Sequence, residues 1–224
     1  MLRLVYAILV STISDCTVPF CEFVIIDVHL HHREMDMTST ITQEKKWTVL
    51  SSEYLIRRPW LTARRDVARL PDGRINDEYY VLEYPDWVNI IAITTDGQFV
   101  LERQYRHGLG NTCYELPCGV IEEGETPLQA AQRELLEETG YAGGQWQEWM
   151  TLSPNPATST NLAHSFLAVG VTRVAEQSLD ATEDIDVYLK SPEYVRQLLE
   201  ENQILQALMA APLWKYFGQD KKSV

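Results

Sequence analysis

Three glutamates crowd into the middle of the chain: Glu134, Glu137 and Glu138. On a helix, residues three and four apart are neighbours, so these carboxylates would project from adjoining parts of one face. Like-charge pairs at this spacing cost roughly a few tenths of a kcal/mol each. A bound divalent cation would relieve the repulsion, because clustered carboxylate oxygens suit Mg²⁺ or Mn²⁺. A solvated acidic helix face is the simpler alternative.

The residues around these glutamates carry the start and stop signals of a helix. Thr126 suits the N-cap, Pro127 suits the first helical position, and Gln129 completes a capping box with Thr126. Gly140 is expected to end the helix as its C-cap glycine. An apolar stripe is expected to bury one side of this helix against a sheet: Leu128, Ala131 and Leu135.

Short β-prone runs separated by turn signals precede and follow this helix. Strands are expected within residues 46–56, 60–70, 75–84, 86–94, 98–106, 115–119, 144–152, 164–172 and 185–190. Two further helices are expected over residues 192–201 and 204–217, and Pro212 should kink or divide the second one. This order predicts an α+β fold in which a mixed sheet packs between helices.

The composition is that of an ordinary globular protein. The chain has 224 residues, of which 45% are apolar and 23% charged, and one principal domain is expected. Its formal net charge of −13 argues against binding to nucleic acid polymers, which requires clustered Lys and Arg. An anionic ligand would need a divalent cation or a few placed arginines. Reduced, unbridged thiols are expected at Cys16, Cys21, Cys113 and Cys118, and packing roles, rather than metal ligation or a disulfide, at Cys113 and Cys118.

The first 36 residues hold a short apolar run that resembles a secretory leader only in outline. Polar residues interrupt the run, no A-x-A cleavage site follows it, and it is too short to span a membrane. We therefore expect a cytoplasmic protein with no membrane partner. Translation that starts at Met35 or Met37 would leave this extension out of the working protein. The histidine run of residues 29–32 is more often incidental than a metal site, and we assign it no function.

The first helix and the loop before it match one family pattern, G-x5-E-x7-R-E-U-x-E-E-x-G-U with U apolar, at every fixed position. The segment therefore resembles the Nudix box. The resemblance implies a Nudix-type α/β/α sandwich with a mixed β-sheet, preceded by a small antiparallel N-terminal sheet. The matching residues are Gly119, Glu125, Arg133, Glu134, Leu135, Glu137, Glu138, Gly140 and Tyr141.

A wider likeness, over residues 47–190, is to ADP-ribose and related nucleoside-diphosphate-sugar pyrophosphatases. It implies a nucleotide-type small-molecule substrate, with Arg106 and Arg103 holding diphosphate oxygens and Glu115 at the substrate. Other nucleotide substrates, such as a GDP-sugar, a dinucleotide or a nucleoside triphosphate, are alternatives. A sensor that binds its ligand without cutting it is an alternative of a different class.

The same likeness implies how the chain is divided. Residues 1–36 would be an extension, residues 37–86 the strands of the N-terminal sheet, and residues 87–218 the Nudix hydrolase domain. The N-terminal sheet would help to form a homodimer and would supply Trp47 and Trp60 to stack on the base. Ordinary core or interface packing of both tryptophans is an equal alternative.

The resemblance also implies a mechanism, which is Mg²⁺-dependent hydrolysis of a diphosphate linkage to a nucleoside monophosphate and a sugar phosphate. Glu134 and Glu138 would bind Mg²⁺, while Glu137 would bind a metal or deprotonate the attacking water. The backbone carbonyl of Cys118 is a further candidate ligand. Arg133 would orient the carboxylates through a salt bridge.

One departure from the family pattern concerns the general base. Many ADP-sugar pyrophosphatases carry a catalytic Glu in a loop after the box, but residues 153–164 contain no acid. Three interpretations stay open: Glu137 is the base, an acid from residues 180–186 folds into the site, or the activity differs. His164 lies at the start of an expected strand, where a structural role is the better interpretation.

Overall fold

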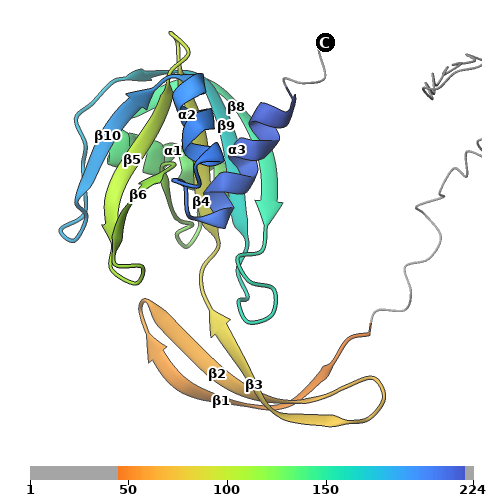
Figure 1. Ribbon diagram of the computed structural model, residues 1–224. Helices are drawn as coiled ribbons and strands as arrows, with labels where there is room; N and C mark the ends of the chain where they lie inside the picture. The colour runs from red at the N-terminus through yellow and green to blue at the C-terminus, as the bar shows by residue number, and fades with distance from the viewer. Residues whose placement is uncertain (1–44, 220–224) are drawn as a thin grey trace, which may run out of the picture. The chain divides into compact units, whose positions relative to one another are not determined.

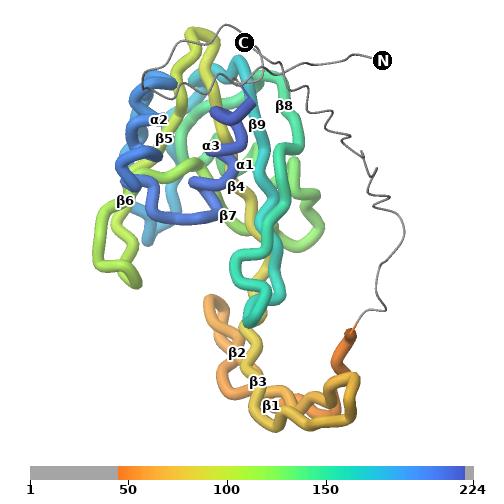
Figure 2. Tube along the Cα trace, turned by 45° about the vertical axis from the view of Figure 1, so that its right-hand side comes forward, coloured from red at the N-terminus to blue at the C-terminus, as the bar shows by residue number. Residues whose placement is uncertain are grey.

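The computed structural model describes residues 45–219, which are coloured in Figures 1 and 2. The expectations for the N-terminal extension, and for Cys16 and Cys21, lie outside these residues. Cys113 and Cys118 are free thiols, the first buried and the second half-buried against the core, in agreement with packing roles. Within residues 45–219, no helix is long and apolar enough to cross a bilayer.

Seven strands form a mixed sheet: β4 (Trp87–Thr94), β5 (Phe99–Arg106), β6 (Asn111–Glu115), β7 (Cys118–Val120), β8 (Tyr141–Leu152), β9 (Ala163–Arg173) and β10 (Ile185–Lys190). The main path of the sheet runs β10-β5-β4-β9-β8, with β6 paired to β5 and β7 paired to β4. Strands β4 and β9 are parallel, and every other pairing is antiparallel. The central strand β4 therefore has neighbours of both directions, as a mixed sheet requires.

Helices cover both faces of this sheet: α1 (Pro127–Thr139) on one face, α2 (Pro192–Glu200) and α3 (Ala207–Gln219) on the other (Figures 1 and 2). Successive side chains of a strand point to opposite faces. Accordingly, Ile90 of β4 packs in the cluster that includes α1, whereas Ile91 packs in the cluster that includes α2 and α3. The predicted α+β class and α/β/α sandwich are confirmed.

Helix α1 begins and ends where the sequence predicts. Thr126 accepts a hydrogen bond from the Gln129 N–H, and the Gln129 side chain accepts one from the Thr126 N–H at 2.9 Å. Gly140 ends the helix in the left-handed region, at φ 76°. The expected apolar stripe is wrong at Leu128, which is 39% exposed. Ala130 and two glutamates of the helix lie on the buried face instead.

Pro212 lies inside α3 without dividing it, so of the two expected effects, a kink or a division, the division is wrong. A proline has no N–H to bond the carbonyl four residues earlier, which here belongs to Leu208. The side-chain amide of Asn89 donates to the Leu208 carbonyl at 3.1 Å instead. Because this substitute donor comes from the buried centre of β4, the helix stays continuous and is tied to the sheet.

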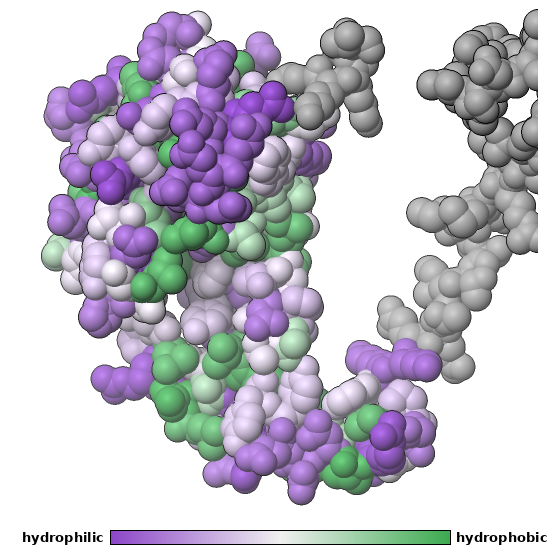
Figure 3. Space-filling view, viewed as in Figure 1, coloured by the Kyte–Doolittle hydropathy of each residue, from purple (hydrophilic) through white to green (hydrophobic). Residues whose placement is uncertain are grey.

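A three-stranded antiparallel sheet precedes β4, formed by β1 (Thr48–Arg58), β2 (Leu61–Arg69) and β3 (Ile75–Glu83). Every residue of β1 is exposed, although many of its side chains are large and apolar. Figure 3 shows apolar side chains, in green, gathered over this sheet. The small antiparallel sheet expected at the N-terminal side is confirmed.

Candidate active site

A pocket of about 800 Å³ opens where α1, β5, β7 and the connection before β10 meet. Its charged lining comprises Arg106, Glu122, Arg133, Glu134, Glu137, Glu138, Asp180 and Glu183. Six carboxyl groups therefore face two guanidinium groups, so acidic groups outnumber basic ones in the pocket. Such a pocket would repel a diphosphate unless a cation came between them.

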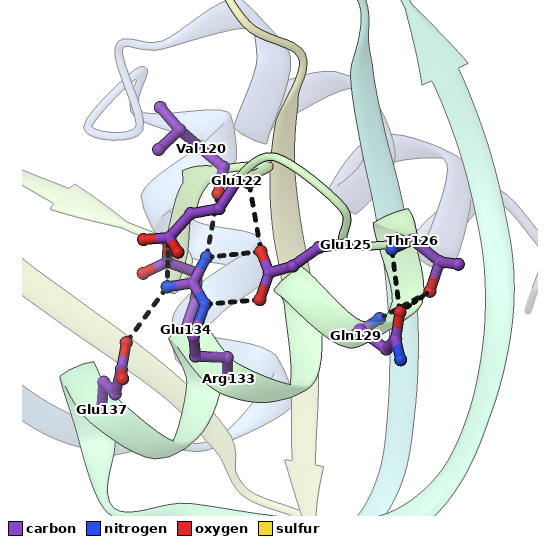
Figure 4. A network of polar contacts seen from close by, with 8 residues as sticks. All are labelled: Val120, Glu122, Glu125, Thr126, Gln129, Arg133, Glu134 and Glu137. Carbon is purple, nitrogen blue, oxygen red and sulfur yellow. Dashed lines mark hydrogen bonds and ion pairs between the residues drawn. The ribbon is translucent and has the colours of Figure 1, made fainter.

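Arg133 is the hub of the polar contacts at the rim of this pocket (Figure 4). Its Nε donates to Glu125 Oε1 at 2.8 Å, and its Nη2 donates to the Val120 carbonyl at 3.0 Å. Its Nη1 lies 2.9 Å from Glu134 Oε1 and 3.1 Å from Glu137 Oε2. One side chain therefore joins the loop before α1 to two of the clustered glutamates.

Glu134 and Glu138 point from α1 toward the sheet and are only 8% and 3% exposed. Glu138 Oε2 accepts a hydrogen bond from the Cys118 N–H at 2.8 Å. Glu134 packs against the bare Cα of Gly119, where a Cβ would lie 2.0 Å from Glu134 Oε1. Burial raises the pKa of Glu134 to about 7, and burial followed by the charge of Glu102 raises the pKa of Glu138.

Glu102 of β5 is a further carboxylate behind this site. It is completely buried, and neither of its oxygens has a hydrogen-bond partner among the described residues. Its carboxyl group contacts that of Glu138, and its strand register places it opposite Glu115 of β6. Burial, followed by the charge of Glu115, raises the pKa of Glu102. A buried, unpartnered carboxylate is costly, so Glu102 is stabilised either by a proton or by a nearby positive charge.

Arg106 lines the pocket at the end of β5, and Glu115 holds it there. The Arg106 Nε lies 2.9 Å and 3.0 Å from the two carboxylate oxygens of Glu115, which is itself 3% exposed. Glu115 therefore lies behind Arg106 rather than on the pocket surface. Arg103 points to the opposite face of the sheet, where its guanidinium lies 5.1 Å from the centre of the Tyr114 ring. The structure does not bring Arg103 to the pocket.

The two tryptophans expected at the base lie in different places. Trp60, in the turn between β1 and β2, lines the pocket and is 80% exposed. Trp47 lies edge-on to Tyr79, with 5.7 Å between ring centroids, and lines a smaller hollow of about 240 Å³ on the N-terminal sheet. Within this chain, Trp60 alone of the two reaches the acidic pocket.

The segment of residues 178–184, between β9 and β10, brings two more acids to the pocket. Asp180 and Glu183 both line it. The charge of Glu183 also contributes, after burial and nearer charges, to raising the pKa of Glu134 and of Glu138. This placement favours the second of the three interpretations for the missing acid, an acid from residues 180–186.

The acid-free connection between β8 and β9 packs elsewhere. The Leu82 N–H of β3 donates to the Thr158 carbonyl at 2.7 Å, and the Thr160 N–H donates to the Leu82 carbonyl at 3.1 Å. His164 Nε2 lies 3.3 Å from Asp86 Oδ2. These contacts join the connection to the N-terminal sheet, and His164 has a structural partner.

Comparison with known families assigns both parts of the chain. Residues 84–210 match the NUDIX domain, and residues 47–82 match the nucleoside diphosphate sugar hydrolase N-terminal domain. The first match alone covers more than half of the chain. The chain belongs to the Nudix family. As a member with the complete box, it is a pyrophosphohydrolase.

Several relatives of this Nudix chain are named as pyrophosphatases of ADP-ribose or ADP-sugars. It is 30% identical to ADP-ribose pyrophosphatase of Bacillus subtilis over 142 residues, which is 63% of this chain and 76% of that protein. It is 54% identical to mouse ADP-sugar pyrophosphatase over 115 residues, 47% of this chain and 53% of that protein. A solved ADP compounds hydrolase, 22% identical, shares the fold with a TM-score of 0.69 over 80% of this chain and 97% of that one.

The Nudix box of this chain fits a hard divalent cation. Within residues 45–219, no three His, Cys, Asp or Glu side chains converge as a ready-made metal centre. Mg²⁺ does not require one, because it is typically held by one or two carboxylates together with waters and substrate phosphates. The buried carboxylates of Glu134 and Glu138, with the unpartnered oxygens of Glu102 behind them, are donors of the right kind.

Sequence reasoning missed Glu102 and left Glu183 as one of several acids. The only sequence feature that points to Glu102 is its place in the alternation of the strand. It follows Val100 by two residues and therefore shares the face that packs on α1. That signal is weak, because the first half of β5 is buried on both faces. For Glu183 there was no local signal, since its place depends on how the connection folds back over α1.

Proposed function

We propose that this Nudix enzyme hydrolyses the diphosphate linkage of a nucleoside-diphosphate sugar, with ADP-ribose first among the candidates. The products would be a nucleoside monophosphate and a sugar phosphate, and Mg²⁺ would be the cofactor, with Mn²⁺ as a substitute. The names of the relatives and the match of the N-terminal sheet to a nucleoside diphosphate sugar hydrolase domain support this substrate class.

One observation carries the proposal: the carboxylates of α1, the acids of residues 178–184 and Arg106 line a single pocket. Pyrophosphate hydrolysis needs charge neutralised on both the attacked and the leaving phosphate. A bound divalent cation supplies that charge and lowers the pKa of a coordinated water. Glu134 and Glu138 would hold it, with the backbone carbonyl of Cys118 as a further ligand.

The remaining charged groups orient the substrate and the carboxylates. Arg106, held from behind by Glu115, would bind diphosphate oxygens through its free N–H groups. Arg133 keeps Glu134 and Glu137 in place through its contacts with both. Trp60 at the pocket wall would stack on the base. Because Arg103 and Trp47 lie away from the pocket in this chain, we propose no substrate contact for them there.

The general base is proposed to be Glu183 rather than Glu137. Glu137 already accepts a hydrogen bond from Arg133 Nη1 at 3.1 Å, so one of its oxygens is engaged. Glu183 accepts a hydrogen bond from the Asp180 N–H at 2.8 Å and keeps its second oxygen for a water. Under the third interpretation, the chain would have a different activity, which the substrate panel below tests.

A panel of nucleoside-diphosphate sugars, dinucleotides and nucleoside triphosphates, assayed with Mg²⁺ for phosphate-containing products, tests the function. ADP-ribose should be turned over fastest.

Glu183→Gln should lower kcat by about 10²- to 10⁴-fold, as expected for loss of a general base, and Glu137→Gln should lower it less. Glu138→Gln should abolish metal-dependent turnover while leaving the fold intact. Unchanged hydrolysis by Glu138→Gln would contradict the site.

A further inference from the structure

One side chain ties both ends of the 178–184 segment to helix α1. The Gln177 Nε2 donates to the Glu138 carbonyl at 2.7 Å and to the Ile185 carbonyl at 3.0 Å. The next residue adds a third link, because the Ser178 N–H donates to the Glu137 carbonyl at 2.8 Å. The segment therefore leaves and returns at a single point beside the last turn of α1.

The chemistry of this contact requires glutamine. A primary amide carries two N–H bonds on one nitrogen, and each of them here meets a different carbonyl. A glutamate of the same length offers two acceptors and would face two carbonyl oxygens. An asparagine has the same amide but is shorter by one methylene. Neither glutamate nor asparagine at position 177 would therefore make both contacts.

The tied segment is internally braced and presents acids to the pocket. The Asp180 N–H donates to Glu183 Oε2 at 2.8 Å, and the Glu183 N–H donates to the Asp180 carbonyl at 3.0 Å. Both acids line the pocket. The carbonyl that Gln177 binds belongs to Glu138, whose carboxylate lies in the same pocket. Movement at position 177 would thus change the spacing between Glu183 and the box glutamates.

We propose that Gln177 is a positioning residue for catalysis, which fixes Glu183 at its working distance from Glu134 and Glu138. The proposal rests on the proposed function, because it acts through Glu183. The competing explanation is a purely structural one, in which Gln177 only satisfies a free carbonyl at the end of α1. The two explanations differ in whether the effect of Gln177 depends on Glu183.

A double-mutant cycle in the full chain separates them. The variants are Gln177→Leu, Glu183→Gln and the double variant, with Gln147→Leu on the exposed side of β8 as the matched control. The measurements are kcat and KM, the affinity for Mn²⁺ by electron paramagnetic resonance, and Tm. Gln177→Leu should lower kcat by about tenfold to a hundredfold with a smaller change in KM, as expected for a misplaced catalytic group.

The decisive result is non-additivity. In the Glu183→Gln background, Gln177→Leu should change kcat by less than about twofold, because residues that act as one unit do not add. Gln177→Glu and Gln177→Asn should fail to rescue kcat, and the Gln147→Leu control should match the wild type. A Tm loss with unchanged kcat, or equal kcat losses in both backgrounds, would overturn the proposal.

Failure of the proposed function would look different. If the wild type hydrolyses no diphosphate compound, the proposed function is wrong. The double-mutant cycle of Gln177 and Glu183 is then evaluated from the affinity for Mn²⁺. Weaker Mn²⁺ binding by Gln177→Leu that disappears in the Glu183→Gln background would still support positioning of Glu183. Additive or absent effects on Mn²⁺ affinity would overturn it.

Discussion

At the scale of single residues, the site depends on carboxylates that the fold keeps away from water. Glu138 and Glu102 lie against each other in the interior, and Glu134 is nearly as buried. Ionising them without a cation is unfavourable because they lose hydration and repel one another. The same carboxyl groups suit a divalent cation, because a bound cation would replace their protons and stabilise the ionised form.

This burial predicts a specific pH dependence for the metal-free chain. Because the pKa of Glu134 and of Glu138 is raised in the folded state, folded molecules bind more protons than unfolded ones above pH 4.5. The protonated forms of Glu134 and Glu138 therefore contribute fully to the free energy of unfolding below pH 4.5. This contribution is lost as the pH rises, and for Glu134 the loss is centred on the folded-state pKa of about 7. The loss can reach about 1.4 kcal/mol per pH unit for each group.

Urea unfolding in EDTA at several pH values between 5 and 8 measures this effect. The free energy of unfolding of the wild type should fall with pH relative to that of Glu138→Gln, which carries no charge at that position. Added Mg²⁺ should reduce the difference. Parallel curves for the two proteins in EDTA would contradict the effect.

At the scale of elements, β7 and α1 meet so closely that a glycine is required. Gly119 has no side chain, and Glu134 occupies the space that a Cβ would fill. The close approach places the backbone of β7, including the Cys118 N–H, within reach of the box carboxylates. The contact therefore fixes how close the proposed metal ligands on α1 lie to β7.

Gly119→Ala should displace the Glu134 carboxylate, because the new Cβ would lie 2.0 Å from its Oε1. Affinity for Mn²⁺ should fall by about tenfold or more, in the range seen when ligand orientation is disturbed. Tm should change little, because the clashing atoms are the end of a flexible side chain. Gly108→Ala, whose added Cβ would meet nothing within 4 Å, is the matched control. Equal Mn²⁺ affinity in the two variants would contradict the role of this contact.

The sequence predicted the elements better than it predicted their contacts. Capping residues and turn residues act locally, so the limits of α1 could be inferred from Thr126 and Gly140 alone. The exposure of Leu128 and the burial of Glu102 depend on which neighbours the sheet supplies. The strict spacing of the box located Glu134 and Glu138, but the nearness of Glu183 requires the fold of a connection that carries no such pattern.

At the scale of the whole molecule, the N-terminal sheet ends in an edge strand that nothing in residues 45–219 covers. Strand β1 pairs with β2 on one side only and is exposed along its full length. Its large apolar side chains include Val49, Leu55 and Ile56. An exposed apolar edge of this kind favours association, and we propose that a second copy of the chain covers it.

Sedimentation velocity tests this homodimer. The wild type should sediment at twice the chain mass of 25.7 kDa, and Leu55→Glu should shift it toward the monomer because a charge would be buried in the interface. Val174→Glu, at an exposed apolar position after β9, is the control and should leave the dimer intact. A wild type that stays monomeric at micromolar concentration would contradict the proposal.

The pairing of Pro212 with Asn89 links two parts of the chain in a different way. The proline in α3 is tolerated because an amide on β4 serves the carbonyl that it leaves free, and that buried amide has a partner because the proline is there. The effect of a substitution at position 89 on the free energy of unfolding should therefore depend on whether position 212 is proline, and the reverse should also hold. We therefore expect the effects of substitutions at the two positions on stability to be non-additive, although the positions are far apart in the sequence.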